Sequence, residues 1–252
     1  MDYATNIKNQ LFTLIDQMDL SCWLFTRNPE KDFTRKKKWS FSEIMKFMLS
    51  MEGKSLKDEL NEYFDYDFET PSNSSFNQRR AQILPESFEF LFKEFMASLN
   101  NSSKTYNGYK LIACDGSDFC YSSDPSDTVS YVQTPVDVKG YNRLHLNALY
   151  DLLDRTYVDA IIQGNRQMNE KRAMCDMVDR FKFYKKTIFI ADRGYENYNL
   201  FAHVEKPGMY YLVRVRDIDR RGILGRLTLP KESCFDTHVS YTLTKKQTKE
   251  WL

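Results

Sequence analysis

Residues 1–100 alternate apolar and polar positions with the period of an α-helix. Apolar residues recur three or four positions apart in residues 7–18, 44–51, 56–64 and 88–99. Ser40 stands three residues before Glu43, which is the spacing of a capping box at a helix start. Pro85 marks the end or restart of a helix. The pattern predicts a region of short helices with a common apolar core.

Beyond the polar stretch at 100–107, the pattern changes to short apolar runs. Residues 111–114 and 187–191 suit strands buried on both faces. Five further segments predict a hairpin from 144–151 and 156–163, helices over 169–182 and 196–205, and a strand over 209–215. This order of elements fits a ribonuclease-H-like sheet, in which the first and fourth strands are parallel neighbours. The predicted fold class is therefore α/β: a ribonuclease-H-like mixed sheet flanked by helices, after an N-terminal all-α region.

Two aspartates follow the two buried runs directly. Asp115 comes after residues 111–114 and Asp192 after residues 187–191, each before a glycine within two residues. We expect both strands to end there and to deliver their carboxylates into turns at one edge of the sheet. Adjacent strand ends lie about 5 Å apart, where two bare charges repel by about 3 kcal/mol at an effective dielectric of ~20. A magnesium ion would relieve that repulsion, because it prefers such oxygen ligands.

The pair of aspartates thus predicts a divalent-metal site for phosphoryl transfer. Taken singly, each aspartate is as typical of a structural turn or N-cap residue as of a functional one, and it is the pair that favours the metal site.

Composition limits the other functional classes. The 252 residues carry a formal net charge of +1, so nucleic-acid binding has to depend on local basic patches. Candidate DNA-binding residues lie in two such patches, Lys36, Lys37 and Lys38 in one and Arg79 and Arg80 in the other. Side chains of this kind either release counterions from DNA phosphates or form a solvated surface.

Cysteine, histidine and hydropathy indicate a cytoplasmic protein. The chain has five cysteines, an odd number, and none of them shows C-x-x-C spacing. This pattern is typical of unpaired, buried cysteines in a protein of the reducing cytosol. Three widely separated histidines argue against a zinc site. No stretch approaches 18 apolar residues, so neither export nor membrane insertion is expected.

Several segments, taken in order, resemble a known family. They are Asp115-Gly116-Ser117, residues 145–151 (HLNALYD), residues 169–172 (NEKR) and residues 191–195 (ADRGY). With the strand at 211–215 and the stretch at 74–88, they resemble the DDE transposases of the insertion-sequence-four type. The resemblance covers roughly residues 70–216.

The resemblance implies two-metal phosphoryl transfer on DNA. Asp115 and Asp192 correspond to the first two catalytic acids, which bind Mg²⁺ or Mn²⁺ in that family. Arg193 corresponds to a position near DNA phosphates, although a salt bridge to a nearby glutamate is an equal alternative. The implied partner is double-stranded DNA, at transposon ends and target, and a homodimer is compatible with it. The implied location is the bacterial cytoplasm, in association with the nucleoid.

The third catalytic acid of the family has no counterpart at its usual place. It belongs to a Tyr-x-x-Arg-x-x-x-Glu pattern, which does not occur after Arg214. We therefore expect a helical region at 1–100, a partial catalytic domain at 108–217 and the start of a β-rich insertion at 218–252, in a truncated copy. Glu196 and Glu205 remain as substitutes for the missing acid.

Two other functions remain open at this point. The chain could bind transposon ends or a full-length partner without cutting DNA. It could also be a metal-dependent nuclease or phosphatase that shares only the pair of aspartates with the transposases.

Overall fold

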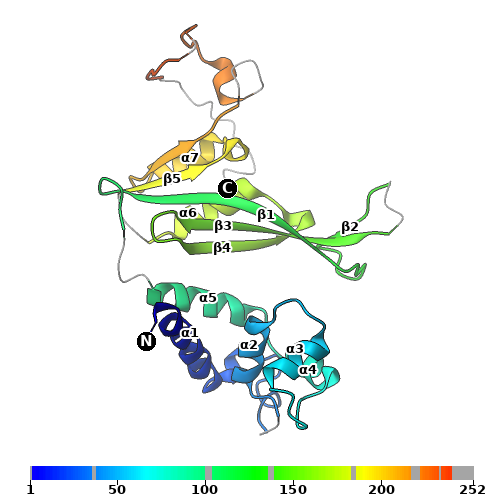
Figure 1. The fold of residues 1–252 in the computed structure, drawn as a ribbon. Helices are drawn as coiled ribbons and strands as arrows, with labels where there is room; N and C mark the ends of the chain where they lie inside the picture. Colours follow the sequence, from blue (N-terminus) through cyan, green and yellow to red (C-terminus); the bar gives the residue numbers. More distant parts are fainter. Residues whose placement is uncertain are drawn as a thin grey trace. The chain divides into compact units, whose positions relative to one another are not determined.

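The computed structural model divides the chain into two compact units, residues 1–101 and 102–252 (Figure 1). Each unit is described by itself. The structure describes residues 2–35, 38–99, 104–135, 139–182, 186–216, 222–232 and 234–239.

The first unit is helical, as the periodicity predicts. Its α-helices are α1 (Tyr3–Asp19), α2 (Phe41–Ser50), α3 (Leu56–Tyr63), α4 (Asn73–Arg80) and α5 (Glu86–Leu99), with a 3-10 helix, η1, at Cys22–Phe25. The Ser40 hydroxyl accepts the Glu43 N–H at 3.0 Å, so the predicted cap at the start of α2 is confirmed. The core is aromatic, with Trp39, Phe41, Phe47 and Phe76 at most 1% exposed.

The second unit contains one six-stranded mixed sheet. Its strands are β1 (Lys110–Tyr121), β2 (Tyr131–Val132), β3 (Tyr141–Asp151), β4 (Thr156–Gly164), β5 (Thr187–Ala191) and β6 (Tyr210–Val213). They follow the order β2-β3-β1-β5-β6, and β4 pairs with β3. β1 is antiparallel to β3 and parallel to β5. This arrangement, with its flanking helices, confirms the ribonuclease-H-like α/β prediction.

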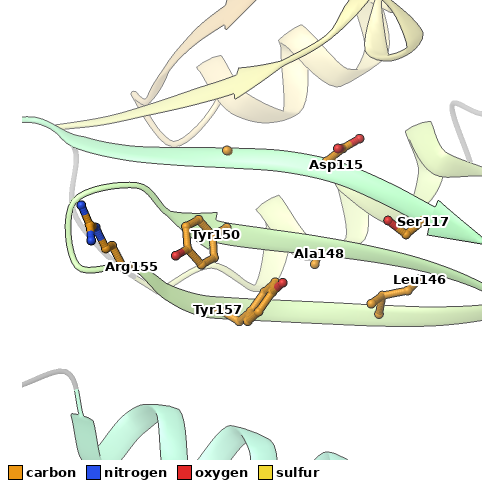
Figure 2. A pocket seen from close by; sticks show the side chains of 8 residues that line it. Asp115, Ser117, Leu146, Ala148, Tyr150, Arg155 and Tyr157 are labelled. Carbon is orange, nitrogen blue, oxygen red and sulfur yellow. The ribbon is translucent and has the colours of Figure 1, made fainter.

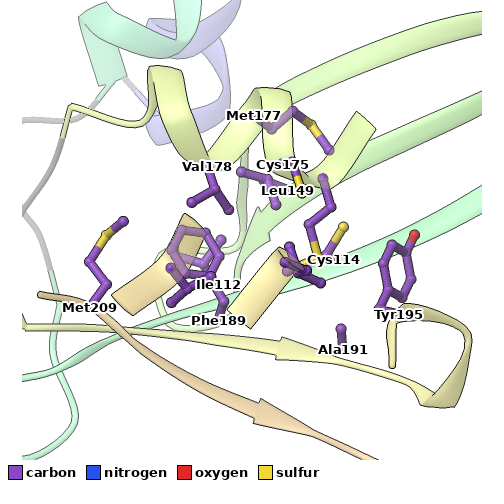
Figure 3. Packing of buried hydrophobic residues seen from close by; sticks show 13 residues of the cluster. Ile112, Cys114, Leu149, Cys175, Met177, Val178, Phe189, Ala191, Tyr195 and Met209 are labelled. Carbon is purple, nitrogen blue, oxygen red and sulfur yellow. The ribbon is translucent and has the colours of Figure 1, made fainter. Parts of the chain in front are cut away.

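Two helices, α6 (Glu170–Arg180) and α7 (Tyr198–Glu205), cover one face of the sheet. Figure 3 shows the apolar core between them and the strands. Ile112 and Cys114 of β1 and Phe189 of β5 lie in this core together with methionines of α6. Because side chains alternate along a strand, the intervening residues of β1 face the opposite side of the sheet.

One boundary prediction is wrong at a place that matters for the site. β1 does not end at Cys114 but continues to Tyr121, so Asp115 lies inside a strand and not in a turn. The reason is the partner strand, because β3 pairs with β1 continuously out to Tyr121 opposite Asn142. The long antiparallel ladder overrides the local turn preference of Gly116-Ser117.

The last described segment carries little regular structure. Ile223–Arg226 forms a 3-10 helix, η4. No strand occurs within the described residues 222–232 and 234–239. The alternating run at 239–243, which suggested a β-rich insertion, falls almost wholly outside the described residues.

Candidate functional site

Asp115 and Asp192 lie side by side at one edge of paired strands. The parallel ladder between β1 and β5 ends with Cys114 opposite Ala191, and each aspartate is the next residue along its chain. Both aspartates are exposed. Parallel neighbours lie about 4.8 Å apart, so the ladder brings two positions 77 residues apart in sequence to one place.

The β5 side of the site is a short, tight turn. Asp192 accepts the Gly194 N–H on Oδ1 at 2.7 Å and caps the 3-10 helix η3 (Arg193–Tyr195). The N-cap role considered from sequence is therefore present, and it uses only one oxygen of the carboxylate. The cap fixes where the carboxylate lies at the end of β5.

A second polar group lies on the helix-covered side of β1. Glu170 opens α6, where Asn169 caps the helix by accepting the Arg172 N–H at 3.0 Å. The ring of His145 is nearly buried, and its Nδ1 lies 2.7 Å from Asp118 Oδ1. Its Nε2 lies 3.2 Å from Glu170 Oε1 but makes no hydrogen bond. The histidine thus has one hydrogen-bonded nitrogen and one buried nitrogen that faces the Glu170 carboxylate without a hydrogen bond.

Two glycines leave room for these side chains. A Cβ at Gly116 would lie 2.5 Å from His145 Nε2 and 3.3 Å from Glu170 Oε1. A Cβ at Gly194 would lie 3.0 Å from Asp192 Oδ1 and 3.6 Å from Glu170 Oε2. Glycine at both positions therefore keeps open the space around the Glu170 carboxylate, between β1 and the turn after β5.

The negative charge of this region contributes to the raised pKa values of two buried residues, Cys114 and Tyr195. Burial raises the pKa of the Cys114 thiol to about 12, and the charges of Asp115 and Glu170 add to the rise. Burial is also the first cause of the raised pKa of the Tyr195 phenol, with Cys114, Glu170 and Asp115 as further causes. Both carboxylates are thus within electrostatic reach of the same buried groups.

The opposite, open face of the sheet has a pocket beside Asp115 (Figure 2). Its volume is about 500 Å³, within the range of ligand pockets. Small and aromatic side chains of β1, β3 and β4 line it, and Arg155 lies at the turn between β3 and β4. The lining residues are Ala113, Asp115, Ser117, Leu146, Ala148, Tyr150, Arg155 and Tyr157.

The basic residues of the first unit fall into different environments. Lys36 and Lys37 lie outside the described residues. Lys38 is exposed and forms an ion pair with Glu69 at 2.6 Å. Arg79 is nine-tenths buried, donates to Gln82 at 3.0 Å and stacks over an aromatic ring, which suits a structural role. Arg80 is exposed on α4.

In the second unit, Arg193 is exposed directly after Asp192. Among the described residues it forms no ion pair, so the salt bridge considered from sequence is not seen. Glu196 accepts the Arg216 N–H at 3.0 Å, and Glu205 accepts the Tyr211 hydroxyl at 3.1 Å. The two substitutes for the third acid are therefore already engaged elsewhere.

The residues just beyond the last pair of the β1–β5 ladder suit a divalent cation in their chemistry. They offer hard carboxylate oxygens from Asp115 and Asp192, and Gly194 leaves open space between Asp192 and Glu170. In the described part of the chain, however, no three His, Cys, Asp or Glu side chains already converge closely enough to hold an ion. Side-chain rotation would have to complete any such site.

Sequence reasoning missed Glu170 and His145 as members of this region. Both belong to segments that carried the resemblance, but no role could be assigned to them. The signal that could have indicated Glu170 is its place in the first turn of the helix predicted over 169–182, directly after the capping residue Asn169. That helix precedes the strand that leads to Asp192.

The fold is a ribonuclease-H-like α/β sheet, and Asp115 and Asp192 follow the last residue pair of the parallel ladder between β1 and β5. The family described as Transposase DDE domain matches residues 106–252. Because the match covers more than half of the chain, the protein belongs to that family. Membership implies DNA as the partner and a transposition enzyme as the general class.

A search of curated proteins finds no match to this chain. Among the described residues, no helix combines the length and apolar character that crossing a bilayer requires.

Proposed function

We propose that the protein is a transposase of the insertion-sequence-four type, which cuts and joins DNA at transposon ends by two-metal phosphoryl transfer. The observation that supports this most directly is the register of β1 and β5. Cys114 and Ala191 form the last pair, and Asp115 and Asp192 follow them. Two exposed carboxylates on adjacent strands are a suitable donor set for a hard divalent cation.

In this proposal Asp115 and Asp192 hold Mg²⁺ or Mn²⁺. When bound, the cation supplies Lewis-acid chemistry to phosphoryl transfer. The protein contributes fixed positions for the carboxylates, because β1 is tied to β3 and β5 on both sides and Asp192 is held by its cap to Gly194. The backbone that carries the two carboxylates is therefore already in place, and only their side chains would have to rotate to bind the cation.

The open face beside Asp115 is the proposed approach for a DNA strand. Tyr157 is 52% exposed on this face, so a base can stack on its ring. Arg155 lies along the same pocket, where its charge would attract the phosphate backbone. Arg193, exposed beside Asp192, would contact phosphate from the other side of the pair of acids.

A nicking assay tests the role of the two aspartates. Supercoiled plasmid incubated with the protein and Mn²⁺ should be converted to open circles, and Asp115→Asn and Asp192→Asn should each slow this at least about tenfold. Asp176→Asn is the matched control, because the Asp176 side chain is 46% exposed on α6 and pairs with Arg172 on the same helix. Its rate should equal that of the unaltered protein.

The same samples separate the competing functions. If the Asp192→Asn protein nicks as fast as the unaltered protein, Asp192 does not belong to the site. DNA binding that weakens with salt but is never followed by nicking would favour the non-catalytic, end-binding alternative.

A further inference from the structure

One α-helix of the first unit differs from the others in its charge. α4 (Asn73–Arg80) has the sequence NSSFNQRR and carries no acidic residue, whereas α1, α2, α3 and α5 each carry at least one. Its two basic residues lie in the last turn. Among the α-helices that the structure describes in this unit, α4 is therefore the one on which a polyanion meets no carboxylate of the same helix.

Three features hold α4 in place by one side. The Ser72 hydroxyl accepts the Ser75 N–H at 3.2 Å and caps the start of the helix. Phe76 is 1% exposed in the aromatic core, and Arg79, one turn further along, stacks over the ring of Phe33. The helix also packs against α2 and α3 (Figure 1). The opposite side of α4 is consequently presented to solvent in a fixed position.

That exposed side consists of amide and guanidinium groups. Asn73, Asn77 and Arg80 are exposed and follow one another at spacings of four and three residues, so they share one side of the helix. Gln78 is exposed beside them. In the part of the chain that the structure describes, no hydrogen bond or ion pair engages the side chains of Asn77, Gln78 and Arg80. The Arg80 guanidinium only lies over the ring of Phe76, 5.7 Å from its centre.

Side chains of these types recognise base edges in duplex DNA. Asparagine and glutamine pair with adenine through two hydrogen bonds, and arginine pairs with guanine in the same way. A helix of eight residues is about 12 Å long, and the major groove is about 12 Å wide. Arg27 lies at the C-terminal end of α4, where its Nε donates to the Ala81 carbonyl at 2.9 Å. Its exposed charge is suited to a phosphate beside the groove.

The charge of the rest of the unit restricts DNA binding to this one surface. Residues 1–101 contain more acidic than basic residues, so the unit as a whole would not attract DNA. The connection between α3 and α4, residues 64–72, is also longer than the turn of a helix-turn-helix motif. Recognition of DNA therefore has to come from the side chains of α4 and not from membership of that motif.

We infer that α4 enters the major groove of double-stranded DNA and selects its sequence. Asn77, Gln78 and Arg80 contact base edges, and Arg27 contacts a phosphate. The assignment goes beyond the proposed function, because sequence recognition by the first unit requires no metal ion. A merely solvated polar helix is the alternative, and it predicts that substitutions on α4 change neither affinity nor sequence preference.

Selection from random DNA tests this assignment. The full chain is incubated in EDTA with duplexes whose central base pairs are random, and the retained duplexes are sequenced. We expect enrichment of a sequence with guanine and adenine at neighbouring positions. Gln78→Ala should weaken binding of the enriched duplex at least about fivefold, the lower end of the range for a lost base contact. Gln17→Ala is the matched control, because Gln17 is exposed on α1, and it should bind like the unaltered protein.

Arg80→Gln separates base recognition from a structural role. Glutamine pairs with adenine where arginine pairs with guanine, so selection with this variant should replace the enriched guanine by adenine. A structural role for Arg80 would leave the selected sequence unchanged. Circular dichroism should show the same helix and strand content in every variant.

The outcomes separate recognition by α4 from the proposed function. If the unaltered protein enriches no sequence, or if Gln78→Ala and Arg80→Gln select and bind like it, α4 does not recognise DNA, and nicking by the pair of aspartates is unaffected. Equal weakening by Gln78→Ala and Gln17→Ala would show a general effect and would overturn the role of α4. Sequence selection that is lost on changing α4, in a protein that never nicks DNA, would support α4 and refute the proposed catalysis.

Discussion

The substitution Gly116→Ala probes the packing between β1 and His145. An added Cβ would lie 2.5 Å from His145 Nε2 and 2.9 Å from Cε1, whereas ordinary contacts begin at 3.4 Å. The ring has little room to retreat, because it is 4% exposed and bound to Asp118 at 2.7 Å. Overpacking of this kind costs about 1–3 kcal/mol, and we expect Gly116→Ala to destabilise the second unit by that amount.

The sign of the effect should reverse once the ring is removed. In a His145→Ala background, the Cβ of alanine at position 116 meets only the end of the flexible Glu170 side chain, at 3.3 Å among the contacts of the glycine structure, and alanine lowers the conformational entropy of the unfolded chain. A gain of about 0.4–1 kcal/mol is then expected from Gly116→Ala, provided the strand backbone suits alanine. The difference between the two backgrounds is the coupling energy of a double-mutant cycle.

Urea unfolding followed by far-UV circular dichroism measures these free energies. In a Trp251→Phe background, tryptophan fluorescence provides an internal reference, because Trp23 and the buried Trp39 both belong to the helical unit. Ser117→Ala is the control: Ser117 is exposed and faces the opposite side of β1, so its change should stay within about 0.5 kcal/mol. An equal loss from Gly116→Ala with and without His145 would refute the reasoning.

Two further predictions concern stability and thiol reactivity. Lys110→Met should lower the free energy of unfolding in urea by about 3–5 kcal/mol, because it leaves the 1% exposed carboxylate of Asp151 without its ion pair at 2.8 Å. Lys93→Met, which removes an exposed ion pair, is the control. A loss from Lys110→Met no larger than that from Lys93→Met would contradict the prediction. Cys114, whose pKa burial raises to about 12, should resist iodoacetamide at pH 8.5 while the exposed Cys120 reacts, as mass spectrometry would show. Since the folded pKa of Cys114 exceeds its ordinary value of 9.0, its contribution to stability is complete below pH 9 and declines as the pH rises toward 12.

Local pattern predicted most elements of the fold. The run at 187–191 matches β5, and the hairpin predicted at 144–151 and 156–163 appears as β3 and β4. These segments are strongly periodic and bounded by turn or cap residues, so local preference and tertiary packing agree. The end of β1 was missed because pairing with a distant strand, and not the residues themselves, decides how far it extends.

In the candidate site, too, some residues could be identified from local sequence and others only from the tertiary structure. Asp115 and Asp192 could be found because each follows an apolar run, which is a signal contained in a few neighbouring residues. Glu170 and His145 could not be assigned a role from sequence. Glu170 starts α6 and His145 lies on β3, and no spacing in the sequence indicates that their side chains meet beside Gly116. Likewise, the basic pair at 79–80 reads as one patch in sequence, but one arginine is buried and the other exposed.

The sequence alone determined the two classes of structure, the order of the elements and the two acids that end apolar runs, because hydrophobic periodicity and strand-end chemistry are local properties. Tertiary structure decided that β1 and β5 are in register, that Asp115 belongs to a continuous strand, and that Glu170 adjoins Asp192. Those facts depend on pairing and packing between residues far apart in the chain, which no local pattern specifies.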